Sequence, residues 1–201
     1  MPTGVALQDP RQQLYSAAER ILVREGSAAL TSRSVTTEAG VAKGVLHRHF
    51  SDFDDFLAEL VRDRIARLGA QADDLQRSVG VGTITDNLAE AVIAWFDPVA
   101  LSIVALVTSR DRLRTRLRET TPTGLPLLTE AGGRLIDYLS AEQQHGRIRP
   151  DANVRVLALN VIGTAHLLLA GDLGALPDPA AVREVIETIM VGAEPASAPD
   201  H

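Results

Sequence analysis

The chain has 201 residues, no cysteine and a formal net charge of −6. Hydrophobic residues make up 45% of it but aromatic residues only 3%, which indicates a globular protein with an aliphatic, helical core and excludes extensive disorder. The absence of cysteine excludes disulfides, thiolate chemistry and most structural zinc sites. Because no apolar run reaches about 18 residues and no secretory signal precedes Pro10, we expect a cytoplasmic protein with no membrane partner.

Helical periodicity runs along the chain, and no run of alternating polar and apolar residues predicts a strand. The fold class expected is therefore all-α. The first helix is expected over 10–25 and ends at Gly26. Its apolar residues recur at helical spacing and would pack on the next two helices; they are Leu14, Ala17, Ala18, Ile21 and Leu22.

Residues 31–50, TSRSVTTEAGVAKGVLHRHF, predict two short helices joined by a glycine turn. Thr31 is suited to cap a helix over 32–39, and Gly40 can adopt the positive φ that ends it. A second helix over 43–50 places Leu46 and Phe50 on one face. This is the pattern of a helix-turn-helix, in which the second helix enters the DNA major groove.

The opposite face of the second helix suits DNA. Gly44 allows close approach of the backbone, Val45 suits contact with a thymine methyl, and Arg48 suits a guanine edge or a phosphate. The DNA-binding residues predicted from the motif are Thr31, Arg33, Ala42, Lys43, Gly44, Val45, His47 and Arg48.

Further helices are expected over 53–76, 85–96, 99–119, 125–145, 151–170 and 179–192, separated by glycines and prolines. The organisation predicted is a three-helix helix-turn-helix domain over 1–52, a helical effector-binding and dimerisation domain over 53–193 and a disordered tail over 194–201. The alternating arginines of 110–118 spread around a helix, so we expect a solvated surface there.

The segment 11–50 resembles the N-terminal domain of TetR/AcrR-family transcriptional regulators. The resemblance covers 11–57 and rests on several features together, among them Ala39-Gly40-Val41, Lys43-Gly44, Leu46 and His49-Phe50. It implies a homodimer that binds a palindromic DNA operator and a small-molecule effector, and it implies repression.

Three positions depart from the family pattern, which usually has serine, tyrosine and lysine where this chain has Ala42, His47 and Phe53. Those family residues tend to face phosphates, so weaker DNA binding is one expectation. The alternative function is therefore a helical ligand-binding or protein-interaction module with a weakened DNA-binding domain. Asp52, Asp54 and Asp55 are expected to cap the following helix.

The segment 154–170, VRVLALNVIGTAHLLLA, is apolar nearly all round, which predicts burial on two sides. Together with the helix near 180–191 it suits half of a four-helix bundle across a two-fold axis, although a central core helix of a monomer is the alternative. The dimer-interface residues predicted are Leu159, Ile162, His166, Val182, Val185 and Ile189.

An aliphatic pocket for a largely apolar effector is expected in the larger domain, with simple core packing as the alternative. Its predicted lining is Trp95, Phe96, Ser102, Tyr138, Asn160 and Thr164. For Asn160, Thr164 and His166, hydrogen bonding at the dimer interface is a further interpretation.

No paired nucleophile and base, no HExxH and no glycine-rich phosphate loop is present, so we expect no catalytic residues, no cofactor and no enzyme activity. His47 and His49 point to opposite sides of a helix, which argues against a metal site. Residues 1–50 carry six Lys/Arg against four Asp/Glu, a balance of +2, which leaves −8 for the rest. The small positive excess lies in the predicted DNA-binding segment.

Overall fold

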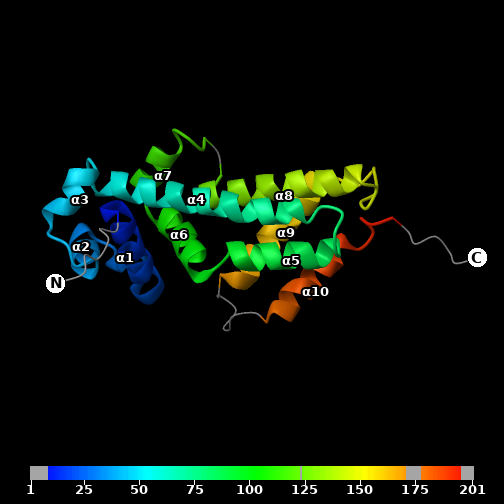
Figure 1. The fold of residues 1–201 in the computed structure, drawn as a ribbon, viewed down its shortest axis with the longest axis horizontal. Helices are drawn as coiled ribbons and strands as arrows, with labels where there is room; N and C mark the ends of the chain where they lie inside the picture. The colour runs from blue at the N-terminus through cyan, green and yellow to red at the C-terminus, as the bar shows by residue number, and fades with distance from the viewer. Residues whose placement is uncertain (1–8, 123, 171–177, 196–201) are drawn as a thin grey trace, which may run out of the picture. The chain divides into compact units, whose positions relative to one another are not determined.

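The structure is a computed structural model that describes residues 9–122, 124–170 and 178–195. Every regular element in this described part is a helix, which confirms the all-α prediction (Figure 1). The first elements are α1 (Pro10–Glu25), the 3₁₀ turn η1 (Ser27–Ala29), α2 (Ser32–Glu38), α3 (Gly44–His49) and α4 (Phe53–Arg77). They are followed by α5 (Ile84–Trp95), α6 (Pro98–Ser109), α7 (Asp111–Leu117), α8 (Pro126–Gln144), α9 (Val154–Leu169) and α10 (Pro179–Met190).

Local sequence signals set the helix ends. The Asp9 carboxylate accepts a hydrogen bond from the Arg11 backbone N–H at 2.9 Å, directly before Pro10, and Asp178 caps α10 in the same way before Pro179. Thr83 caps α5 and Asn153 caps α9. The observed bounds of these helices lie within a few residues of those expected because capping and periodicity are properties of short segments.

The single helix predicted over 99–119 is wrong, because Arg110 interrupts it. Arg110 has extended backbone angles, φ −124° and ψ 101°, so α6 ends at Ser109 and α7 begins at Asp111. The Arg110 guanidinium donates to the backbone carbonyl oxygens of Leu30 at 2.7 Å and Ser27 at 3.3 Å. This tertiary contact accompanies the break. The helical periodicity of the segment does not predict it, because its partners lie in another part of the chain.

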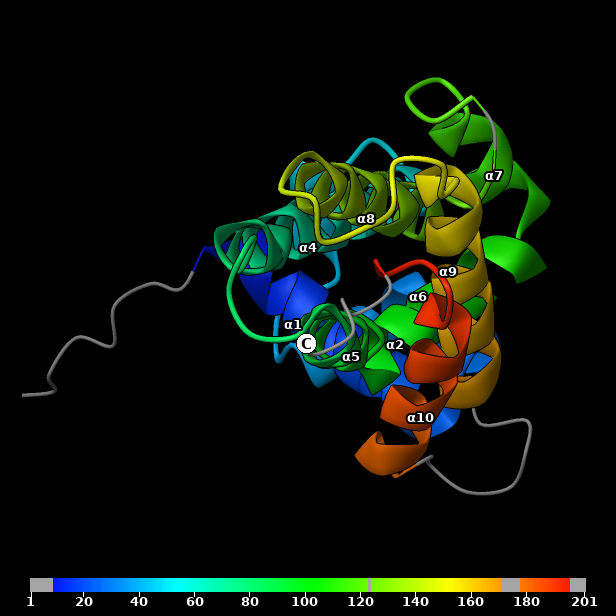
Figure 2. The same cartoon turned by 90° about the vertical axis from the view of Figure 1, so that its right-hand side faces the viewer.

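The chain divides into two compact units, Met1–Asp63 with Pro98–Leu125, here called unit 1, and Arg64–Asp97 with Pro126–His201, here called unit 2. In unit 1, α1 packs against η1, α2, α3 and α6, and α7 follows α6. In unit 2, α5 lies beside α10, and α9 lies between α8 and α10 (Figure 2). The domain boundary predicted between residues 52 and 53 stays a prediction. Of the disordered tail predicted over 194–201, residues 196–201 lie outside the described residues.

An aromatic cluster holds the first helices of unit 1 together. The ring of Phe50, at the end of α3, lies 5.9 Å from the ring of Tyr15 in α1 and 5.1 Å from that of Phe56 in α4. The Arg11 guanidinium covers Phe50 at 4.7 Å and bonds to Glu59 at 3.1 Å. Because Phe50 is buried among these groups, the short helix α3 has a fixed position on α1 and α4.

No single helix among the described residues is long and apolar enough to cross a membrane. The pair α5 and α6 reaches the required length and hydropathy only when taken together, and it is bent at the break between them.

Candidate nucleic-acid interface

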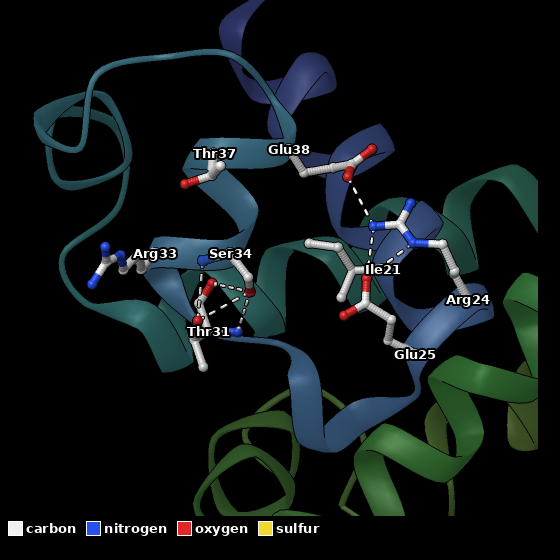
Figure 3. Close-up of a pocket in the computed structure, with 8 residues that line it drawn as sticks. All are labelled: Ile21, Arg24, Glu25, Thr31, Arg33, Ser34, Thr37 and Glu38. Carbon is white, nitrogen blue, oxygen red and sulfur yellow. Dashed lines mark hydrogen bonds and ion pairs between the residues drawn. The ribbon is translucent and has the colours of Figure 1, made fainter.

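The helix α2 begins with a reciprocal cap. The Thr31 hydroxyl accepts a hydrogen bond from the Ser34 backbone N–H at 3.1 Å, while the Ser34 hydroxyl accepts one from the Thr31 N–H at 2.9 Å (Figure 3). Two backbone donors that a helix start leaves without partners are thereby satisfied. The cap fixes the first turn of α2, which carries Arg33 on its exposed side.

The turn after α2 has the geometry that its glycine predicted. Gly40 has φ +66°, its N–H donates to the Thr37 carbonyl at 3.1 Å, and the Val41 N–H donates to the Thr36 carbonyl at 3.0 Å. These two bonds form a Schellman motif, which requires the left-handed backbone that glycine adopts without steric cost. The chain therefore turns sharply from α2 into α3, as in a helix-turn-helix.

Polar contacts lock α2 onto α1. The Glu38 carboxylate accepts hydrogen bonds from Arg20 at 2.7 Å and from Arg24 at 2.9 Å, and Gln13 donates to the Ala39 carbonyl at 2.8 Å. These bonds from Arg20, then Arg24, lower the pKa of the Glu38 carboxyl. The carboxylate stays ionised at neutral pH and holds both arginines on the α1 side of α2.

A surface pocket of about 550 Å³ lies between α1 and α2, and Figure 3 shows the side chains that line it. Arg24, Glu25 and Glu38 are joined by ion pairs on one side, whereas Arg33 and Thr37 extend away from them. Arg24 of α1 is thus neutralised by carboxylates of the protein. The Arg33 side chain of α2 points away from those carboxylates.

The DNA-binding residues predicted from the motif lie on one continuous segment of unit 1, from the start of α2 through α3. Val45 is half-buried and the other predicted residues are exposed, namely Thr31, Arg33, Ala42, Lys43, Gly44, His47 and Arg48. Leu46 and Phe50 are buried, so α3 has one face in the core and one face in solvent. Their roles toward DNA stay a prediction.

Three cations of this segment are free. Arg33, Lys43 and Arg48 make no ion pair or side-chain hydrogen bond with any residue that the structure describes. The arginines of α1, by contrast, are paired with Glu38, Glu25 or Glu59. Among residues 9–58, uncompensated positive charge therefore lies only on α2, on α3 and on the turn between them.

Phe53 and the aspartates around it have structural partners. The Phe53 ring stacks on Phe56 with centroids 5.6 Å apart and lies 5.7 Å from the Arg110 guanidinium. The Asp52 carboxylate accepts from the Asp55 backbone N–H at 2.6 Å and from Arg116 at 2.9 Å, and these bonds lower the pKa of Asp52. The expectation that this aspartate caps α4 is confirmed.

Sequence reasoning missed the role of Arg110 and Arg116, which tie α6 and α7 to the helix-turn-helix within unit 1. Arg110 bonds to the carbonyls of Leu30 and Ser27 just before α2, and Arg116 bonds to Asp52 just before α4. The only signal in the sequence was an arginine-rich run, which predicts an exposed helix equally well.

The effector-pocket residues predicted in the larger domain fall in both units, and their role in binding an effector stays a prediction. Trp95, Phe96 and Tyr138 are buried in unit 2, and burial raises the pKa of the Tyr138 hydroxyl, which accepts a hydrogen bond from Asn87 at 2.9 Å. Asn160 is exposed and Thr164 is half-buried on α9. Ser102 belongs to unit 1, where its hydroxyl donates to the Pro98 carbonyl.

One surface cleft does include Trp95. It has a volume of about 290 Å³, lies between α4 and α5 in unit 2, and has acidic as well as apolar side chains along it. Its lining is Gln71, Asp74, Leu75, Ser78, Asn87, Glu90, Ala91, Ala94 and Trp95.

The predicted dimer residues differ in exposure. Leu159 is 69% exposed, and His166, Val185 and Ile189 are half-buried. Ile162 and Val182 are buried inside this chain. The ring of His166 lies 6.1 Å from that of Phe96, so a residue predicted for the interface contacts one predicted for the pocket.

No group of three or more potential metal-ligating side chains occurs among the described residues.

Comparison with known proteins identifies the first helices. Residues 14–60 match the profile of the bacterial regulatory proteins of the tetR family. No curated relative matches the chain at a significant level. Many solved structures match, and all those cited below are less than 25% identical to this chain, so they establish the fold alone.

Three of these structures have TM-scores of 0.63 to 0.65 to this chain. A TetR-family member from Streptomyces coelicolor has a TM-score of 0.63 and 21% identity, with 90% of this chain and 98% of that one covered. The regulator FadR from Bacillus subtilis, solved with stearoyl-CoA, has a TM-score of 0.64 and 20% identity, with 90% and 98% covered. SmeT, the repressor of the Stenotrophomonas maltophilia multidrug efflux pump SmeDEF, has a TM-score of 0.65 and 17% identity, with 96% of both chains covered.

Proposed function

Since the N-terminal domain of this chain belongs to the TetR family of bacterial regulatory proteins, we propose that the protein is a ligand-responsive transcriptional repressor. It binds a palindromic operator as a homodimer and is released from DNA by a small, largely apolar effector. It is not an enzyme. Because its operator is bacterial DNA, it acts in the cytoplasm.

The observation that carries this proposal is the set of unpaired cations on α2 and α3. Arg33, Lys43 and Arg48 lie exposed on a helix-turn-helix, while the arginines of α1 are neutralised by carboxylates of the same unit. Phosphate contacts supply much of the affinity for DNA, and each requires a cation or donor that is free to reach the backbone. A net charge of −6 for the whole chain does not oppose this, because the free cations are local.

The exposed apolar side chains of unit 2 support the homodimer. α9 and α10 pack against each other and leave apolar side chains in solvent, among them Leu159 and Leu167 on α9 and, half-buried, Val185 and Ile189 on α10. A palindromic operator needs two recognition helices about 34–36 Å apart, which a two-fold dimer supplies. Pairing of α9 and α10 with their copies would bury these side chains.

The effector is proposed to act on the larger domain. The cleft beside Trp95 and the apolar helices around it support a ligand site in unit 2. A structural neighbour, FadR from Bacillus subtilis, was solved with stearoyl-CoA, and another, SmeT, is the repressor of an efflux pump. An effector with a preference of about 1–3 kcal/mol for a form of the dimer that binds DNA poorly changes operator affinity some five- to 150-fold.

The test is fluorescence anisotropy with the full-length protein. Labelled duplexes from upstream of the protein's own gene are compared with shuffled duplexes at two salt concentrations. We expect tight, sequence-selective binding. The logarithm of the binding constant should fall linearly as the logarithm of the salt concentration rises. Lys43→Ala in the same assay separates binding through α3 from adventitious binding.

If the upstream duplex fails, selection from fragmented genomic DNA replaces it. Failure of that selection as well, with the protein folded, would overturn the repressor proposal in favour of a helical ligand-binding or interaction module. The departures at Ala42, His47 and Phe53 are the reason to include this outcome.

A further inference from the structure

The cleft beside Trp95 in unit 2 combines buried apolar side chains with exposed polar ones. Leu75 of α4 and Ala91 and Trp95 of α5 line it and are buried. Ala94, also in the lining, is exposed, and its small side chain leaves space that a larger one would fill. A ligand that covers these side chains needs an apolar body of its own.

The half-buried polar residues of the cleft have already used their hydrogen-bond donors. The Asn87 amide nitrogen donates to the Val81 carbonyl at 2.8 Å and to the Tyr138 hydroxyl at 2.9 Å, so neither of its two hydrogens is left for a ligand. The Ser78 hydroxyl donates its single hydrogen to the Leu75 carbonyl at 2.7 Å. The other side-chain donors of the lining, the Gln71 amide and the Trp95 indole, carry no charge.

The charged groups of the lining are both carboxylates. Glu90 is exposed on α5 and makes no ion pair or side-chain hydrogen bond with any residue that the structure describes. Asp74 on α4 pairs with Arg77, which does not line the cleft, and its carboxylate has lone pairs beyond those that one guanidinium uses. The lining contains no Lys, Arg or His. The cleft therefore presents negative charge that no cation of the lining opposes.

The surroundings of the cleft reinforce this charge. In sequence, unit 2 contains eight Lys/Arg against fifteen Asp/Glu, a balance of −7. Four other surface pockets of the described part each include an arginine, namely Arg24, Arg20, Arg183 and Arg116. A ligand with a negative head group would have a partner in those pockets and would be repelled in the cleft beside Trp95.

We propose that this cleft binds a small organic cation, whose ammonium group pairs with the Glu90 carboxylate in the field of Asp74. The apolar body of the ligand lies against Leu75, Ala91 and Trp95. An ammonium supplies both the positive charge and the charged donors that the lining lacks. The volume of about 290 Å³ suits a small molecule. This inference rests on the proposed function and names the chemical class of its effector.

Titration of the full-length protein with three compounds that share one apolar body tests the charge. At pH 7, 4-phenylbutylamine is a cation, 4-phenylbutan-1-ol is neutral and 4-phenylbutyrate is an anion. Calorimetry and the emission of Trp95, the single tryptophan, report binding. The amine should bind at least about tenfold more tightly than the alcohol or the acid. Equal affinities, or no binding of the amine at millimolar concentration, would overturn the proposal.

Glu90→Gln tests the named carboxylate, because it removes the charge and keeps the size of the side chain. It should weaken binding of the amine about fivefold and leave binding of the alcohol within about twofold of wild type. Glu184→Gln is the matched control, since Glu184 is an exposed glutamate of unit 2 that does not line the cleft. Equal effects of the two substitutions would contradict a direct pair between Glu90 and the ligand.

Ala94→Leu tests the location, because it places a larger side chain in the cleft at an exposed position. Binding of the amine should weaken by about tenfold or more, with circular dichroism showing that the variant is folded. A folded Ala94→Leu variant that binds the amine as tightly as wild type would place the site elsewhere and overturn the proposal.

Failure of this inference differs from failure of the proposed function, because the titrations contain no DNA. A protein that binds operator DNA and shows no preference for the amine would overturn the cation site and leave the repressor. A protein that binds the amine through Glu90 and binds no DNA would overturn the repressor and leave the cleft as the site of a ligand-binding module.

Discussion

At the scale of single residues, Lys43 and Arg48 are exposed cations of the helix-turn-helix with no acidic partner among the described residues. We expect Lys43→Ala to weaken binding to specific and random DNA alike and to reduce the salt slope by about one, because it removes one phosphate partner. Arg48→Ala should instead cost about 1–3 kcal/mol on the specific site and relax its selectivity.

Arg112→Ala is the matched control, because Arg112 is an exposed arginine of unit 1 that lies outside the helix-turn-helix and has no ion pair with any described residue. Anisotropy titrations on operator and shuffled duplexes compare the three variants. An equal loss on both duplexes for Arg48→Ala would contradict a base-reading role.

Glu38 gives a residue-scale prediction about pH. Its carboxyl pKa is lowered by Arg20 and Arg24, so it stabilises the folded state above the ordinary glutamate pKa of about 4.3. That contribution is lost as the pH falls through the lower pKa of the folded protein. The thermal midpoint of wild type should exceed that of Glu38→Gln at pH 7, with the difference shrinking toward about pH 3. A difference that is constant with pH would show that the ionised carboxylate contributes nothing.

At the scale of elements, the break between α6 and α7 joins two parts of unit 1. Arg110→Ala removes two hydrogen bonds from the charged guanidinium to the carbonyls of Leu30 and Ser27. It also removes the cation–π contact of that guanidinium with the Phe53 ring. We expect a loss of stability of about 1–3 kcal/mol and faster hydrogen exchange of the amides at the start of α2. Arg112→Ala, two residues along the chain, should change neither. Unaltered exchange at residues 31–35 in Arg110→Ala would contradict the coupling.

At the scale of the whole molecule, the chain contains a single tryptophan, Trp95, which lies in the proposed effector domain. A compound that releases the protein from DNA through this domain should change Trp95 emission with the same concentration dependence as the loss of anisotropy. Such compounds come from a screen with the DNA-binding assay, and fluorescence titration follows. A compound that releases DNA and leaves the emission unchanged across its active range would place the effector site away from Trp95.

Much of the fold follows from signals within a few residues. The Thr31 and Ser34 cap, the positive φ at Gly40 and the buried pair Leu46 and Phe50 are each predictable from the sequence, because helix ends and faces depend on neighbours within one or two turns. The all-α class and the helix-turn-helix were therefore determined by the sequence alone. The exposed positions of the motif residues follow from the same periodicity.

Only the tertiary structure decided how distant residues combine. The periodicity of 99–119 continues through Arg110, and the break is associated with carbonyls eighty residues earlier. Which arginines are neutral and which are free depends on carboxylates brought close by packing, as Glu38 is to Arg20 and Arg24. An apolar segment such as α9 predicts burial on two sides, but which side its own chain covers is a property of the packed helices.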